Sequence, residues 1–479
     1  MTSEREQVEA AQQEERQPEP VSLGMASENL FDVQVDAWEY TTLGEICARG
    51  KGGVQTGPFG SQLHAADYVA VGIPSIMPQN IGDNRIIRDG IARIPLEDAE
   101  RLGRYRVRAG DIVYSRRGDV ERRALVRKEE EGWLCGTGCL RVRFGFDDVD
   151  PAFASFFLGD PRVRAWIVRH AQGATMPNLN TAILSALPFV VPPLEEQRAI
   201  AQILDTMDDK IELNRKMNET LEAMARALFK SWFVDFDPVR AKAEGRDPGL
   251  PAPIAALFPD SFEDSELGEI PKGWQIMRLD SVCENIFSGG TPSTTAHDYW
   301  DGNIPWLSSG ETRAKFIIST EKFITLQGVE KSSTRLARAG ATVIASAGQG
   351  NTRGQTSMLM FDAYINQSVV ALLPNRLRSS DVHLFFDLER RYEEFRRISD
   401  GHSSRGSLTT KLLGGLTVVL PPLEIVREFD MLAEPMVRKI TCALRESQAL
   451  AALRDSLLPK LISGELRVGK AAELVEAAI

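Results

Sequence analysis

The sequence contains one long internal repeat that constrains the plan of the whole chain. LPFVVPPLEEQ begins at Leu187 and LTVVLPPLE begins at Leu416, so a strand-like apolar run, a proline pair and an acidic helix start occur twice. The spacing from Leu187 to Leu416 is called the repeat interval below. Proline cannot continue the hydrogen-bonding of a strand, but it suits the first turn of a helix. Each copy therefore predicts the point where a β-rich domain ends and a helix begins.

A coiled-coil pattern follows each proline pair. From Glu195 to Trp232, seam residues recur at alternating intervals of three and four, and the repeat interval carries this seam into the second copy. A helix of about 37 residues would be about 55 Å long. We expect the two helices to pair antiparallel, with Asn214 and Asn218 opposite Ala443 and Ser447. The predicted interface comprises Leu204, Met207, Ile211, Asn214, Asn218, Leu221, Leu228, Met436, Ile440, Ala443, Ser447, Leu450, Leu457 and Leu461.

The repeat predicts an α+β fold with two tandem β-rich domains, two long helices in an antiparallel coiled coil, and pseudo-two-fold symmetry. Short apolar segments between Gly-rich turns start at Trp38 and again at Gly273. Pro435 means that the second helix either begins there or kinks nearby. The expected parts are a disordered acidic tail at 1–37, a β-rich domain at 38–191, a helix at 192–234, an acidic Pro/Gly linker at 235–272, a second β-rich domain at 273–420, a helix at 421–468 and a tail at 469–479.

Length and composition are compatible with this plan. A chain of 479 residues with 43% hydrophobic residues can bury two or three cores, because single cores rarely exceed about 250 residues. Five scattered cysteines form no even framework, and no apolar run approaches the roughly 20 residues of a membrane helix. We expect a soluble, cytoplasmic protein, with Met25 as an alternative start.

Charge is unevenly distributed. Residues 1–37 carry a net charge of −7 and residues 235–272 carry −5, which leaves +1 for the remainder of a chain whose total is −11. The stretch 85–143 holds fifteen basic and ten acidic residues, and 311–353 holds seven basic and three acidic residues. Each half therefore has a locally basic stretch, which either is a solvated surface or contacts nucleic acid.

The usual catalytic signatures are missing. GEICARGKGG has the wrong spacing for a phosphate loop, and CGTGC has no second pair of ligands at zinc spacing. Asp208-Asp209-Lys210 is similar to a nuclease acid-x-Lys element but has no paired upstream acid. We therefore expect no catalytic residues and no metal site.

Two loop-bearing domains held by a helical spacer suit DNA, where half-sites on one face lie about 34 Å apart. Arginine pairs with guanine, and asparagine or glutamine with adenine. Each candidate taken alone is as readily a turn former or a solvated side chain. The candidates are Gln55, Ser61, Gln62, Gln79, Asn80, Arg116, Arg117, Arg122, Arg123, Ser308, Ser309, Gln349, Asn351, Arg353 and Gln355.

The helical segments resemble a known family. PPLEEQRAIAQILDTMDDKIELNRKMNETLEAMARALFKSWFVDFDPVRA, at 192–241, is similar to the central conserved region of the specificity subunit of type I restriction-modification enzymes. PPLEIVREF through LRDSLLPKLISGELRV resembles its C-terminal conserved region, and GATMPNLNTAILSALPFVVPPLEEQ resembles the end of a target recognition domain. The resemblance spans roughly 38–468; PPLEIVREF and the acidic N-terminus depart from it.

The resemblance implies two target recognition domains that read an asymmetric, bipartite DNA target in an anti-phage restriction system, without an active site in this subunit. It implies docking of two methyltransferase subunits, which use S-adenosylmethionine to methylate adenine, and of motor and nuclease subunits that use ATP and magnesium. No cofactor is expected on this chain. A self-contained DNA-modifying enzyme and a scaffold that does not bind DNA are the alternatives. The helix charges that would meet the methyltransferase, or are simply solvated, include Arg198, Lys210, Arg215, Lys216, Arg438 and Arg445.

Overall fold

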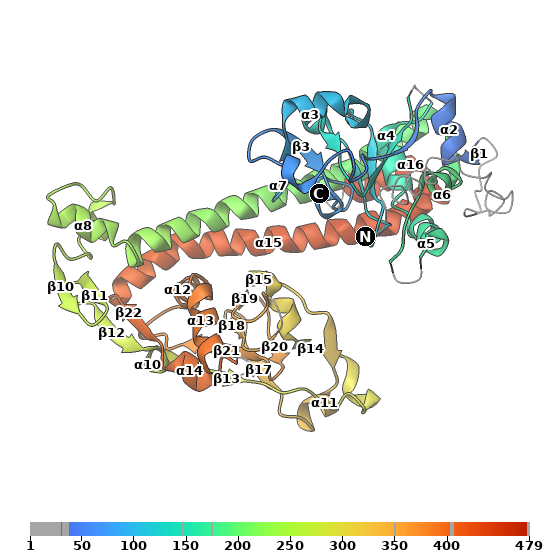
Figure 1. Ribbon diagram of the computed structural model, residues 1–479. Helices are drawn as coiled ribbons and strands as arrows, with labels where there is room; N and C mark the ends of the chain where they lie inside the picture. The colour runs from blue at the N-terminus through green and yellow to red at the C-terminus, as the bar shows by residue number, and fades with distance from the viewer. Residues whose placement is uncertain are drawn as a thin grey trace, which may run out of the picture. The chain divides into compact units, whose positions relative to one another are not determined.

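The computed structural model describes residues 30, 38–145, 148–173, 176–348, 351–402 and 407–476 (Figure 1). Gln349 and, apart from Leu30, the predicted acidic tail lie outside the described residues. The chain divides into two compact units. Unit 1 comprises Met1–Ile211 and Ala449–Ile479, and unit 2 comprises Glu212–Gln448.

The described residues of unit 1 form three small sheets. Strands β1 and β9 pair antiparallel, β2-β8-β5-β6 form a four-stranded sheet, and β4-β3-β7 form a three-stranded sheet in which β3 and β7 are parallel. The strands are β1 (Glu39–Thr42), β2 (Gly53–Thr56), β3 (Ile73–Ile76), β4 (Ala92–Ile94), β5 (Ile112–Ser115), β6 (Arg123–Leu125), β7 (Leu134–Cys135), β8 (Cys139–Arg143) and β9 (Pro188–Val191). The short helices are α2 (Leu43–Arg49), α3 (Leu96–Arg101), α4 (Pro151–Phe157), α5 (Pro161–His170) and α6 (Thr181–Ser185).

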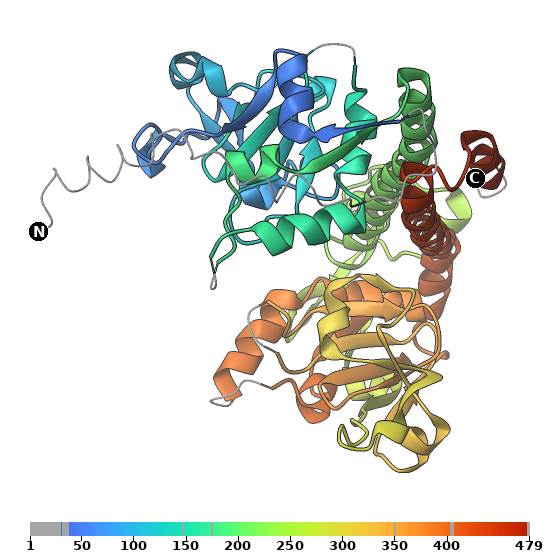
Figure 2. The ribbon, with the colours of Figure 1, turned by 90° about the vertical axis from the view of Figure 1, so that its right-hand side faces the viewer.

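Unit 2 repeats this topology with additions. Strands β12 and β22 pair, β13-β21-β18-β19-β15 form one sheet, and β16-β14-β20-β17 form another in which β14 and β20 are parallel. The β-rich domain of this unit appears in yellow and orange in Figure 2. Its strands are β12 (Gln275–Arg278), β13 (Cys283–Ser288), β14 (Trp300–Leu307), β15 (Phe316–Ile317), β16 (Lys322–Ile324), β17 (Arg335–Ala337), β18 (Thr342–Ala345), β19 (Thr356–Leu359), β20 (Ala363–Ile365), β21 (Val369–Pro374) and β22 (Thr417–Leu420). Its short helices include α10 (Leu279–Val282), α11 (Leu326–Glu330), α12 (Asp381–Glu389), α13 (Tyr392–His402) and α14 (Thr410–Gly414).

The duplication extends to individual backbone hydrogen bonds. In unit 1 the amide of Leu179 donates to the carbonyl of Arg116, the first residue after β5, at 2.8 Å. In unit 2 the amide of Leu408 donates to the carbonyl of Ser346, the first residue after β18, at 2.9 Å. Leu179 and Leu408 are separated by one repeat interval, like the two proline pairs. The loops that follow these two strands therefore have equivalent places in the two domains.

Two glycines maintain an equivalent close approach after the first strand of each large sheet. A Cβ atom on Gly57 would lie 2.1 Å from the carbonyl oxygen of Gly136, and one on Gly289 would lie 1.8 Å from that of Ile365. Any side chain would collide with backbone at either position. Glycine thus brings the loop after β2 against the backbone that follows β7, and the loop after β13 against the end of β20.

The long helices are α7 (Leu194–Phe233) and α15 (Leu423–Ile462), the green and red helices of Figure 1. Within unit 1, Asp208 of α7 contacts Arg454 of α15, and within unit 2, Asn214 of α7 contacts Ser447 of α15, so in each unit the helices pair antiparallel. All residues of the predicted interface are buried or half-buried. Helix α15 starts at Leu423 and continues through Pro435, so the alternative in which it begins at the proline is wrong.

Two segments are more ordered than the sequence suggested. The expected acidic linker contains α8 (Asp237–Ala243), α9 (Ala252–Ala255) and the hairpin of β10 (Phe262–Ser265) and β11 (Gly268–Pro271). Phe258 is buried there against Trp232, with ring centroids 5.2 Å apart. The expected tail forms α16 (Val468–Glu476), because Ala471 and Val475, four residues apart, pack into the core of unit 1. Among the described helices, none is long and apolar enough to cross a membrane.

Candidate nucleic-acid interface

In unit 1, two loops with polar side chains meet beside the four-stranded sheet. The chain leaves β5 at Ser115 into a loop containing Arg116 and Arg117. The guanidinium of Arg116 lies 5.8 Å from the ring centroid of Phe59, which belongs to the loop after β2. Strand pairing places both strands next to β8, so residues far apart in sequence form one polar surface.

Phe59 is a residue that the candidate list missed. Its side chain remains 38% exposed although it is large and apolar. A ring with a guanidinium over one side offers both apolar contact and positive charge, a combination that suits a nucleic acid. The available signal was an aromatic residue between Gly57 and Gly60 in a loop directly after a strand.

Four of the candidates in unit 1 are exposed: Ser61, Gln79, Arg117 and Arg122. Arg122 forms an ion pair with Asp119, and the two side chains are 50% and 46% exposed. An ion pair so accessible to water is weak, and its arginine can exchange the carboxylate for another acceptor at little cost. These side chains are available for contact from solvent.

Three other candidates in unit 1 are engaged in internal hydrogen bonds. Gln55 accepts a bond from Arg141 at 2.5 Å, and Gln62 accepts one from the hydroxyl of Tyr105 at 2.9 Å. The side chain of Asn80 is buried; it accepts from the amide of Met77 and donates to the carbonyl of Ile87, each at 3.1 Å. The bond of Gln55 joins β2 to β8, and the bonds of Gln62 and Asn80 fix loop shape, which is a supporting role rather than a reading role.

Arg123 does not fit the role that the sequence suggested. Its side chain is buried, and the guanidinium donates to the carbonyl of Ser155 at 2.6 Å and pairs with Asp83 at 3.5 Å. Burial lowers the pKa of this arginine, although the neighbouring acidic groups oppose that shift. Because the guanidinium faces the interior, Arg123 is withdrawn from the set of DNA contacts.

In unit 2, the candidates lie after β14 and between β18 and β19. Ser308 caps the short helix η6 (Ser309–Arg313), where its hydroxyl donates to Glu311 at 3.0 Å, and Ser309 is half-buried. Asn351 is exposed, and its carbonyl accepts from the hydroxyl of Tyr392 at 2.9 Å. Two more candidates are less accessible: Arg353 pairs with Asp400, and the side-chain oxygen of Gln355 is buried.

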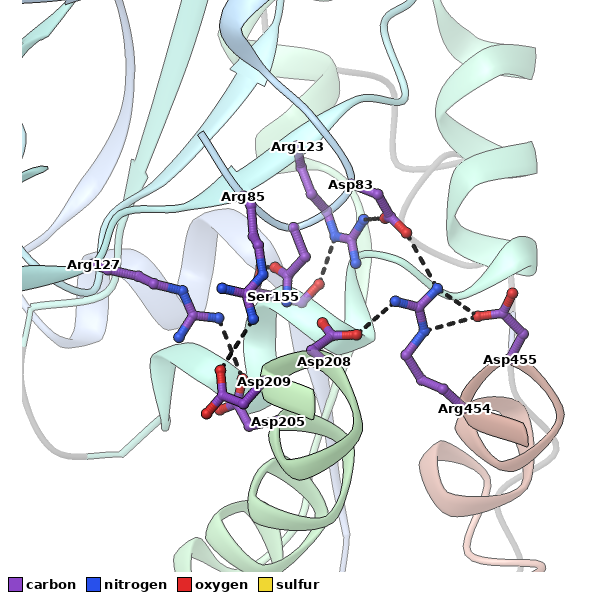
Figure 3. Close-up of polar contacts among 11 residues, drawn as sticks. Asp83, Arg85, Arg123, Arg127, Ser155, Asp205, Asp208, Asp209, Arg454 and Asp455 are labelled. Atoms are coloured by element: carbon purple, nitrogen blue, oxygen red, sulfur yellow. Dashed lines mark hydrogen bonds and ion pairs between the residues drawn. The ribbon is translucent and has the colours of Figure 1, made fainter. Parts of the chain in front are cut away.

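The nuclease-like motif on α7 has a structural use. Asp208 pairs with Arg454, and Asp209 pairs with Arg85 at 3.0 Å (Figure 3). One turn earlier, Asp205 pairs with Arg127 at 3.5 Å, and burial raises the pKa of this aspartate. These carboxylates join the first β-rich domain to the helices. Within the described ranges, no group of three or more His, Cys, Asp or Glu side chains is placed to hold a metal ion.

Comparison with known proteins agrees with the duplicated plan. The family model described as the type I restriction modification DNA specificity domain matches residues 36–223 and 271–430. The HindI specificity subunit of Haemophilus influenzae is 25% identical over 442 residues, which cover 82% of this chain and 95% of that protein. The MjaIX specificity subunit of Methanocaldococcus jannaschii is 25% identical over 300 residues, covering 62% of this chain and 64% of that protein.

A solved structure is similar in fold. The S subunit of a type I restriction-modification system from M. genitalium has a TM-score of 0.56 and 16% identity, and the match covers 91% of this chain and 97% of that one. The α+β class with two β-rich domains and a long helical pair is thereby confirmed.

Proposed function

Because the chain belongs to the family of type I restriction modification DNA specificity domains, we propose that it selects an asymmetric, two-part DNA sequence, with one part read by each β-rich domain. The observation that supports this most is the repetition of one domain plan with different side chains in equivalent loops. Arg116 is the first residue after β5, and Ser346 is the first residue after β18. Their carbonyls accept equivalent backbone hydrogen bonds, but their side chains differ in charge and size. Two copies with different loop chemistry suit two different half-sites.

The exposed polar residues are the proposed readers. Arg117 and Arg122 suit guanine, Gln79 and Asn351 suit adenine, and Ser61 suits either base or phosphate. In unit 1, Arg116 lies over Phe59 in the two loops that also carry Arg117 and Ser61. Gln62 and Asn80 hold their loops in shape through internal hydrogen bonds, and Gln55 joins β2 to β8.

The chemistry of the system belongs to partner subunits in this proposal. Methyltransferase subunits carrying S-adenosylmethionine bind the charged outer faces of the helices, and motor and nuclease subunits use ATP and magnesium. On α7 such a face includes Arg215, whose exposed guanidinium pairs with Glu212 and Glu219. Exposed pairs of this kind can be rearranged by a partner at little cost.

Mapping of methylated adenines tests the function directly. The chain is assembled with its cognate methyltransferase, and methylated adenines are located across a genome that lacks other methylation systems. We expect every modified site to share one two-part sequence with a constant spacer. Binding of the complex should also weaken steeply with rising salt, because phosphate contacts release counterions.

The alternatives give different outcomes. Methylation or cleavage by the isolated chain would identify an enzyme rather than a specificity subunit. DNA binding that is absent or insensitive to salt in the assembled complex would identify a scaffold. Modified adenines without a shared two-part sequence would contradict the proposal.

A further inference from the structure

An ion pair between a buried aspartate and a largely buried arginine occupies the helical seam of unit 1. Arg454 of α15 and Asp208 of α7 lie 2.6 Å apart, and their side chains are 16% and 4% exposed (Figure 3). The guanidinium also contacts Asp83 of the first β-rich domain at 3.2 Å and Asp455 at 2.8 Å. Burial alone would lower the pKa of Arg454, but the carboxylates of Asp208 and Asp455 outweigh burial and raise it. One arginine therefore joins both helices and the domain.

The internal repeat supplies a matched comparison. Across one repeat interval, Asp208 corresponds to Val437 and Arg454 corresponds to Ala225. In unit 2 both of these residues lie in the apolar cluster of the helical seam, at 2% and 0% exposure. The seam can therefore be built at this position with an apolar pair. Since buried ion pairs are often no more stabilising than apolar replacements, stability is a weak reason for the charged pair.

The same repeat makes two incorrect pairings geometrically possible. The helix α7 of one chain could pair antiparallel with α7 of a second copy, and α15 with α15, in the register that the seam already uses. Asp208 would then face Ala225 of the second copy, and Arg454 would face Val437 of the second copy. An α7 pair would bury Asp208 of each copy without its counter-charge, and an α15 pair would leave Arg454 of each copy with only the exposed Asp455 of the same helix beside it.

The asparagines at the middle of the seam do not discriminate in this way. Asn214 donates to Ser447 at 3.2 Å and to Glu446 at 2.7 Å in the observed pairing. In an α7 pair it would face Asn218 of the second copy, and two amides can hydrogen-bond to each other. Discrimination between the correct and incorrect partners must therefore come from another position.

We propose that the Arg454–Asp208 pair directs the two long helices of one chain to each other and excludes pairing of either helix with its counterpart in a second copy. The correct pairing satisfies both charges, and it also presents Arg454 to Asp83, which adds an ion pair between α15 and the first domain. Specificity arises here from the penalty on the alternatives. An uncompensated buried charge disfavours a pairing by a factor on the order of a hundred or more.

The first test copies the apolar pair of unit 2 into unit 1. Native chains and Asp208→Val/Arg454→Ala chains are each produced with two different tags, unfolded together, refolded and purified through both tags in turn. We expect the variant to give at least about ten times more mixed-tag species than the native chain, because both incorrect pairings have become apolar. Equal mixing by the native chain and the folded variant would overturn the proposal.

A second variant keeps the composition and net charge of the chain. Ala225→Arg/Arg454→Ala moves the arginine by one repeat, from α15 to α7. In an α7 pair, the introduced charge faces Asp208 of the second copy, so mixed-tag dimers should become the main species. A folded variant that mixes no more than the native chain would contradict the proposal.

Controls separate pairing from folding. Arg215→Ala removes an exposed ion pair on α7 and should leave mixing at the native level. Increased mixing in this variant would show that the loss of any helix charge is enough to cause mispairing, which would contradict the proposal. Thermal unfolding verifies folding of each variant. If a variant does not fold, Asp208→Asn/Arg454→Gln replaces it, because this double substitution removes both charges with a smaller change of side-chain size. We again expect more mixed-tag species than the native chain gives, and equal mixing by the folded variant would contradict the proposal.

Discussion

Arg122 and Arg123 are adjacent in the sequence but lie in different environments. Arg122 is half exposed and pairs with Asp119, whereas Arg123, the first residue of β6, is buried and donates to the carbonyl of Ser155. Successive side chains along an extended segment point to opposite sides, so one neighbour must face inward when the other faces solvent. The basic stretch of the first domain is therefore part surface and part interior.

This difference predicts opposite results for two alanine substitutions. Arg123→Ala leaves the carbonyl of Ser155 without its donor and opens space in a packed region, so it should destabilise the protein by about 2–4 kcal/mol. Arg122→Ala should change stability by less than about 0.5 kcal/mol, but should weaken DNA binding by the assembled complex. Urea unfolding and a binding titration measure the two effects. Equal loss of stability in both variants would contradict the assignment of Arg123 to the interior.

In unit 2, packing of α12 against α15 partly buries a carboxyl group and disfavours its ionised form. Ser380 is the N-cap of α12, and its hydroxyl donates to Asp430 of α15 at 2.7 Å. Burial raises the pKa of Asp430 from its ordinary 3.8 to about 6, although the hydrogen bond from Ser380 opposes this shift. A carboxyl with a raised pKa favours the folded state most below pH 3.8, and this contribution is lost as the pH rises through about 6.

Replacement of this carboxyl should therefore stabilise the protein only at higher pH. Asp430→Asn keeps an acceptor for Ser380 without the charge, and above pH 7 it should raise the melting temperature by about 2–4 °C, corresponding to about 1 kcal/mol after solvent screening. At pH 4 the native and variant proteins should melt together. Glu424→Gln, at an exposed position of the same helix, provides the control. A gain at pH 4 equal to that at pH 7 would contradict the charge explanation.

Two domains of one topology make the whole molecule modular. The pairs β1-β9 and β12-β22 close the two β-rich domains at equivalent places, and each closing strand leads directly into a long helix. Each of the two domains is thus bounded by its own strand pair. Such a boundary allows one domain to be replaced without redesign of the other.

Exchange of 38–191 for the corresponding domain of another specificity subunit should change one half of the DNA target and leave the other unchanged. Retention of Asp83, Arg85 and Arg127 equivalents in the incoming domain keeps its ion pairs with α7 and α15. The methylated sequences produced by the hybrid complex provide the measurement. A change in both halves would argue against independent reading.

Local patterns in the chain were sufficient to predict the duplication, the heptad seam, the strand-to-helix junctions at the proline pairs and the α+β class. These features depend on the spacing of apolar residues and on proline geometry, which can be read over a few tens of residues. Asn214 and Asn218 were expected opposite Ala443 and Ser447 from the repeat interval, and Asn214 contacts both Ser447 and the carbonyl of Ala443. The order in the expected linker was missed, since Phe258 acquires its burial from Trp232 on another element.

Tertiary packing decided which polar residues remained available to a ligand. The sequence does not distinguish an arginine, glutamine or asparagine that faces solvent from one that holds a loop. Only the folded structure shows that Arg117 and Gln79 are exposed whereas Arg123 and Asn80 are buried. The Arg454–Asp208 pair joins residues 246 positions apart, and Asp83 lies 371 positions from Arg454. Their proximity exists only after the helices pair and the first domain docks, because charge pairing depends on distance in space and burial rather than on sequence spacing.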